Sequence, residues 1–77
     1  MVEFITLEGS FSMPRDEDWV LVIVKKSGRA AARGIVERHK DSAVFYTDER
    51  RAGNTYERAQ DWAEEHYIDT VYIAREH

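Results

Sequence analysis

The sequence predicts an α+β domain, in which a sheet of about five mainly antiparallel strands carries one amphipathic helix, residues 52–67, on one face. Two observations support this class. Apolar residues recur at helical spacing within residues 52–67, and the other apolar runs are short and rich in Val, Ile, Phe and Tyr, as strands are. With 77 residues, of which 43% are hydrophobic, we expect a single domain, residues 1–77, with a small core.

The helix predicted over residues 52–67 has two chemically distinct faces. Its apolar side is formed by Ala52, Tyr56, Ala59, Ala63, His66 and Tyr67. Its opposite side is formed by Glu57, Asp61, Glu64 and Glu65. Asn54, with Glu57 three residues later, is typical of an N-terminal cap, so the regular helix would begin near Thr55. The pattern predicts an alanine-rich face against the sheet and an acidic face in solvent.

Four further segments have the composition of strands: residues 2–7, 19–24, 43–47 and 69–75. The segment 19–24, WVLVIV, is apolar throughout, which is typical of a strand covered on both faces. We therefore expect it near the centre of the sheet. The helix would cover one of its faces, and a second copy of the chain is a candidate for the other, which would make the protein a homodimer.

Residues 29–40 fit either a strand or a helix. Consecutive alanines and Ser27 as a cap favour a helix, and with it a small parallel β-α-β-α-β sheet. Gly34 within the segment and the turn-forming pair Ser27-Gly28 favour a strand instead. That strand would pair back on the apolar strand and then turn at residues 39–42 into the next one. The strand gives the antiparallel sheet stated above, and the parallel sheet is the alternative.

None of the residue patterns for catalysis, metal binding or cofactor binding occurs in the sequence. Without cysteine, thiolate zinc sites and thiol chemistry are excluded. The serines lie in predicted turns, and the glycines match neither of the glycine-rich phosphate-binding spacings. His66 has no second histidine four residues away, and its position beside the apolar face indicates a packed residue. We therefore predict a non-enzymatic protein with no cofactor and no metal.

The sequence also lacks the usual signals for membranes and secretion. Its longest apolar run, residues 19–24, is too short to cross a bilayer. Its N-terminus has no basic segment followed by an apolar core, the pattern of a signal peptide. We expect a cytoplasmic protein.

The net charge of −4 conceals a separation of charge along the sequence. Residues 25–40 hold six basic residues and one acidic residue, whereas residues 41–77 hold nine acidic and four basic residues. We expect the acidic helix face and nearby carboxylates to bind a protein partner that has a basic surface. The candidate residues are Asp48, Glu49, Glu57, Asp61, Glu64 and Glu65.

Two other functions fit parts of the sequence. The basic segment from Lys25 to Lys40, with Trp19 and Tyr46 as stacking rings, would suit direct nucleic-acid binding. The overall negative charge opposes a polyanion, so this function ranks below protein binding. A small ligand-binding or enzymatic α/β domain is the function that would accompany the parallel sheet.

An acidic, cysteine-free chain of 77 residues with acidic side chains along one helix, Glu57 to Glu65, resembles the small inhibitors encoded by phages, including anti-CRISPR proteins. The resemblance is one of size and charge over the whole chain and involves no motif. It implies a non-enzymatic protein that acts by blocking the basic, nucleic-acid-binding surface of a larger complex.

Overall fold

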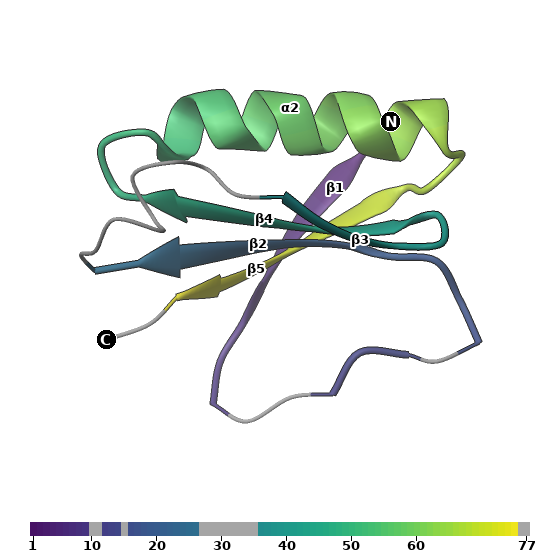
Figure 1. The fold of residues 1–77 in the computed structure, drawn as a ribbon, viewed down its shortest axis with the longest axis horizontal. Coiled ribbons are helices and arrows are strands. Elements are labelled where there is room, and N and C mark those ends of the chain that lie inside the picture. The colour runs from purple at the N-terminus through teal and green to yellow at the C-terminus, as the bar shows by residue number, and fades with distance from the viewer. Residues whose placement is uncertain (10–11, 15, 27–35, 76–77) are drawn as a thin grey trace.

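The computed structural model describes residues 1–9, 12–14, 16–26 and 36–75 (Figure 1). In chain order, the elements are β1 (Glu3–Leu7), β2 (Val20–Lys25), β3 (Val36–His39), β4 (Ser42–Asp48), α2 (Ala52–Glu65) and β5 (Thr70–Arg75). The strands form one sheet in the order β1-β5-β2-β4-β3, and α2 lies along one face of it. The α+β class, with a helix covering a sheet, is confirmed.

The direction of the strands differs from the expectation. Strands β1, β5, β2 and β4 all run parallel, and only the pairing of β3 with β4 is antiparallel among the described residues. The prediction of a mainly antiparallel sheet is therefore wrong. The physical reason is connectivity: a tight turn gives an antiparallel pair, whereas a connection that crosses the domain, such as α2 between β4 and β5, returns the chain in the same direction.

For residues 29–40, which fit either a strand or a helix, the structure decides between the two only for the last part. Residues Val36–His39 form a strand, and the expected turn into the next strand is confirmed, with Lys40 in the left-handed conformation at φ 58. The expected pairing of this strand with the apolar strand is wrong, because β4 lies between β3 and β2. Residues 27–35, including the Ser27-Gly28 turn, lie outside the described residues.

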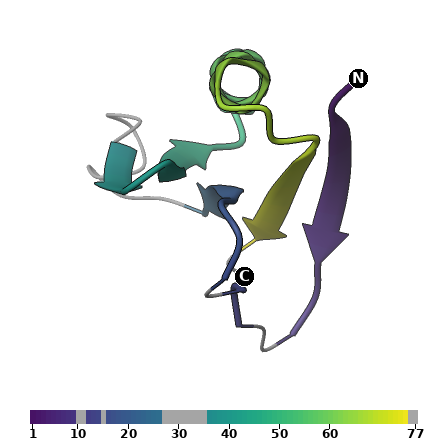
Figure 2. The ribbon, with the colours of Figure 1, turned by 90° about the vertical axis from the view of Figure 1, so that its right-hand side faces the viewer.

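The apolar strand β2 occupies the centre of the sheet, as its lack of alternation predicted. On the helix side, Val20 and Val22 have no exposed surface. On the opposite side, Leu21 is only 5% exposed. Of the connection between β1 and β2, the described residues 12–14 and 16–19 lie on the side of the sheet away from α2 (Figures 1 and 2).

Helix α2 packs on the sheet through small residues, as its alanine-rich face predicted. Its buried residues, at spacings of three and four, are Ala52, Thr55, Ala59 and Ala63. Small side chains let the helix backbone approach the sheet closely, and Ala59 and Ala63 join one core cluster with the β2 valines. The sequence pattern missed Thr55, which is buried and whose hydroxyl donates to the carbonyl of Arg51 at 3.3 Å.

The helix begins earlier than the expected cap at Asn54. Its first residue is Ala52, the N-cap is Arg51, and Asn54 is an exposed residue of the first turn. The Asp48 carboxylate accepts the backbone N–H of Arg51 at 3.0 Å and so steadies the turn that leads into α2. The predicted Asn54 cap is therefore wrong, because a carboxylate from the preceding strand stabilises the entry to the helix.

Candidate functional site at the C-terminal end of the helix

Helix α2 ends in a Schellman motif that places a tyrosine where glycine is usual. The N–H of Ile68 donates to the carbonyl of Ala63 at 2.8 Å, and the N–H of Tyr67 donates to that of Glu64 at 3.3 Å. Between these bonds the backbone of Tyr67 is left-handed, with φ 58. A side chain in this conformation costs about 1 kcal/mol, which is why glycine is preferred there.

The Tyr67 ring stands free in solvent, with 96% of the residue exposed. The sequence pattern assigned Tyr67 to the apolar face of the helix, and this assignment is wrong because the helix ends at Glu65. Tyr67 thus combines backbone strain with a large aromatic surface that packs on nothing within the described residues. Residues that reduce stability in this way are often found at binding sites.

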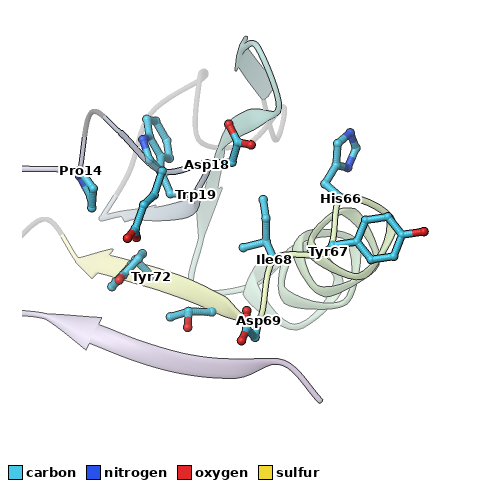
Figure 3. Close-up of a pocket in the computed structure, with 10 residues that line it drawn as sticks. Pro14, Asp18, Trp19, His66, Tyr67, Ile68, Asp69 and Tyr72 are labelled. Carbon is cyan, nitrogen blue, oxygen red and sulfur yellow. The ribbon is translucent and has the colours of Figure 1, made fainter.

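A hollow of about 320 Å³ lies beside Tyr67, between the end of α2 and the starts of β2 and β5. Figure 3 shows Trp19, Ile68 and Tyr72 around this hollow, while the Tyr67 ring points away from it. The backbone N–H of Trp19 donates to Oγ of the buried Ser42 at 3.1 Å, which fixes the position of the segment entering β2. The residues that line the hollow also bring three carboxylates to this end of the molecule, those of Glu17, Asp18 and Asp69.

Four of the predicted partner-binding residues, Glu57, Asp61, Glu64 and Glu65, are exposed along α2. The last two stand in its final turn, at the same end as Tyr67 and the carboxylates of the hollow. We call this surface the acidic end. It comprises Glu17, Asp18, Asp61, Glu64, Glu65, Tyr67 and Asp69.

The other two predicted residues lie at the opposite end of α2 and are engaged within the chain. Asp48 holds the backbone of Arg51, as described above. Glu49 forms an ion pair with Arg75, whose Nη1 lies 2.9 Å from its Oε1. The structure therefore does not join Asp48 and Glu49 to the acidic end.

Basic residues gather where β2 and β5 end and α2 begins. This basic end comprises Lys25, Lys26, Arg50, Arg51 and Arg75. Basic residues thus outnumber acidic ones at the N-terminal end of α2, where Asp48 and Glu49 also lie, and acidic residues outnumber basic ones at its C-terminal end. Three basic residues border the acidic end: Lys40 lies beside Glu17 and Asp18, and Arg38 and Arg58 line a groove with Asp61 and Glu65. The helix macrodipole has the same polarity, and it favours the reverse placement by about 0.3–1 kcal/mol for each charge near a terminus. The observed arrangement therefore weakens α2.

This opposition gives a prediction about stability. Replacing both Glu64 and Glu65 by Lys should raise the free energy of unfolding by about 1 kcal/mol, because positive charge would then face the negative helix terminus. In a domain of this size that corresponds to a rise of about 4–8 °C in Tm, measured by circular dichroism. Glu57→Lys, in the middle of α2, should leave Tm nearly unchanged. A lower Tm for the double variant would show that these carboxylates stabilise the fold.

Trp62 attaches the last turns of α2 to the hairpin of β3 and β4. Its Nε1 donates to the carbonyl of Asp41 at 3.3 Å, and its ring meets that of Phe45 edge-on, with centroids 6.5 Å apart. The ring of His66 stacks on it at 4.2 Å, and His66 Nδ1 donates to the carbonyl of Trp62 at 2.9 Å. His66 is therefore packed and hydrogen-bonded, as expected. Trp62 was missed, because it stands on the flank between the two faces of the helical pattern.

The rings proposed for nucleic-acid stacking do not share a basic surface. Trp19 lies beside the acidic end, next to Glu17 and Asp18. Tyr46 lies toward the other end of the sheet, where Lys25 Nζ is 5.1 Å from its ring centroid. Of the six basic residues of the segment from Lys25 to Lys40, Arg29 and Arg33 lie outside the described residues. The other four are divided between the two ends of the sheet: Lys40 lines a hollow with Trp19, and Lys25 lies over Tyr46. The described geometry thus gives this alternative no combined site.

Within the described residues, no group of three or more His, Asp or Glu side chains is arranged to hold a metal ion. The same part of the chain has no helix with the length and apolar character that a membrane crossing requires. Comparisons with known protein families, with curated proteins and with solved structures found no match to this chain.

Proposed function

We propose that the protein is a non-enzymatic binding module whose acidic end contacts a basic surface on a larger protein. The observation that carries this proposal is Tyr67, which is 96% exposed and held in a left-handed conformation beside the carboxylates of the acidic end. A partner of this kind would have a surface built for nucleic acid, and the module would block it as phage-encoded inhibitors do.

The chemistry of the acidic end suits a protein interface. Interfaces are commonly anchored by Tyr, Trp or Arg side chains surrounded by a polar rim. Tyr67 supplies a large ring that loses little rotamer freedom on binding, and Glu64 and Glu65 supply rim charges in the turn before it. Because the Schellman bonds fix its backbone, Tyr67 projects from a defined position and not from a loose terminus.

The separation of charge adds long-range selectivity. Carboxylates gathered at one end attract a basic surface before contact and orient the encounter, which raises the association rate. The basic end, on the other side of the molecule, disfavours the reversed orientation. The proposal also explains why charges that oppose the helix macrodipole are present. They weaken α2, but they speed the association with a basic partner.

Site-specific photo-crosslinking tests the proposal. A photoreactive phenylalanine analogue at position 67 should cross-link a discrete protein partner in cells that contain the natural target, and the adduct should carry a basic, nucleic-acid-binding surface. The same analogue at Asn54, an exposed residue of the first helical turn, is the matched control and should give no such adduct. An adduct formed from position 54 and not from position 67 would place the contact at the basic end and refute the proposal.

A further inference from the structure

Strand β1 lies at the edge of the sheet, and large apolar side chains in and before it are exposed. Its one strand neighbour among the described residues is β5, and the views of the fold show it at the margin of the sheet (Figures 1 and 2). The described residues include four exposed large hydrophobic side chains, and three of them, Met1, Phe4 and Ile5, lie in β1 or just before it. Phe4 and Ile5 are 41% and 42% exposed, on opposite faces of the strand.

The backbone of β1 has hydrogen-bonding groups directed away from the sheet. The N–H of Glu3 donates to the carbonyl of Asp69 at 2.8 Å, so residue 3 faces β5. Because successive residues of a strand point their backbone groups to alternate sides, Ile5 and Leu7 also face β5. Phe4 and Thr6 therefore present their N–H and C=O groups outward, ready to pair with another strand.

Within the described residues, this edge lacks the features that usually prevent pairing. Natural edge strands are often protected by proline, lysine, a bulge or a covering loop. The five residues of β1, EFITL, contain neither proline nor lysine, and their single charge is on Glu3, at one end. They pair with β5 without a break in register from Glu3 to Leu7. The described part of the chain thus offers an unprotected strand edge.

We infer that β1 is an association edge for a second copy of this chain, paired antiparallel about a two-fold axis at Ile5. In this register all five residues of β1 are paired, and the outward-facing Phe4 lies opposite Thr6 of the second copy. Each such pair exchanges two backbone hydrogen bonds. The two sheets would join into one continuous sheet, with both helices on the same face.

The arrangement of charge and apolar residues favours this register. Ile5 lies opposite its own copy at the axis, so two exposed apolar side chains cover each other. Glu3 lies opposite Leu7 of the second copy, which keeps the two carboxylates apart. A shift that centres the axis on Glu3 would place like charges directly opposite and leave much of the strand unpaired. The contact is small, so we expect a weak dimer that forms with rising concentration.

The inference is independent of the proposed function, because it uses the β1 edge and not the acidic end. Sedimentation velocity from about 10 µM to about 1 mM should show a shift from monomer to dimer, the range expected for a small interface. Thr6→Pro should abolish this shift and keep a native circular dichroism spectrum, because the lost N–H faces outward and edge strands tolerate proline. Thr6→Ala retains the N–H and should dimerise as the natural chain does.

The register can be tested without proline by placing charged residues at position 5, which lies on the proposed two-fold axis. Ile5→Lys and Ile5→Glu should each be monomeric, since like charges would face each other across the axis. An equimolar mixture of the two variants should regain a heterodimer. Val44→Lys, on the open face of the sheet and away from β1, should leave dimerisation unchanged.

Four outcomes would overturn the inference. The natural chain could remain a monomer throughout the concentration range, or form species that keep growing, as head-to-tail association does. Thr6→Pro could dimerise as well as Thr6→Ala. Dimerisation could also be abolished by Val44→Lys while it survives Thr6→Pro, which would mean that the open faces of two sheets stack.

Discussion

Ala63→Asp is expected to unfold the protein, whereas Asp61→Ala, two residues away on α2, is expected to leave its stability nearly unchanged. Ala63 has no exposed surface and belongs to the core cluster with Val20 and Val71. A carboxylate at this position would be buried without a partner, at a cost of several kcal/mol. A domain of this length has a total stability of about 4–12 kcal/mol, so most of it would be lost.

Urea unfolding followed by circular dichroism measures both effects. Ala63→Asp adds both a buried charge and extra volume to the core. Ala63→Val adds volume to the same site without charge, and overpacking alone costs about 1–3 kcal/mol. The expected order of unfolding midpoints is Asp61→Ala highest, then Ala63→Val, then Ala63→Asp. Equal midpoints for Asp61→Ala and Ala63→Asp would mean that the helix is rotated from the orientation described here.

The elements of the fold could be predicted from the sequence, but the direction of the strands could not. The alanines of α2 fall at helical spacing because the helix must lie close to the sheet, and this spacing can be read directly. The unbroken apolar run of β2 likewise revealed its central place. An unbroken apolar run such as that of β2 is also typical of parallel strands, and the parallel sheet was the alternative, but the composition of β1 did not indicate its direction relative to β5.

The candidate site was foreseen only in part, for similar reasons. The phase of the helix correctly placed Glu64 and Glu65 in solvent. The same pattern wrongly extended the helix to Tyr67, because no glycine marks the end of α2 and a tyrosine occupies the position that glycine usually takes. The pairing of Glu49 with Arg75 joins residues 26 positions apart, and only the parallel sheet brings them together.

Reversing the charge of the acidic end should abolish partner binding while the fold is retained. The change is the triple replacement of Asp61, Glu64 and Glu65 by Lys, all at exposed positions. A single exposed charge pair contributes about 0.2–1 kcal/mol, so single changes are poor tests. Three reversals remove three attractions and add three repulsions, which should weaken binding by more than about tenfold. Thermal stability should not fall, because two of the new cations face the helix terminus.

The matched control reverses the basic end instead, through Lys26→Glu, Arg50→Glu and Arg51→Glu. These side chains are also exposed, and the change in charge has the same size. This variant should bind the partner as the natural chain does. Because both triple variants should keep a native circular dichroism spectrum, the comparison separates the location of the binding surface from any loss of fold.

The role of the acidic end is tested most directly by the rate at which the protein associates with the partner identified by cross-linking through position 67. This rate is measured as a function of salt concentration. For the natural chain the rate should fall steeply as salt screens the attraction over a Debye length of about 10 Å at 0.1 M. For the acidic-end triple variant it should be slow and nearly independent of salt. If that variant associates as fast as the natural chain, or if the basic-end variant alone loses binding, the acidic end is not the surface through which this protein acts.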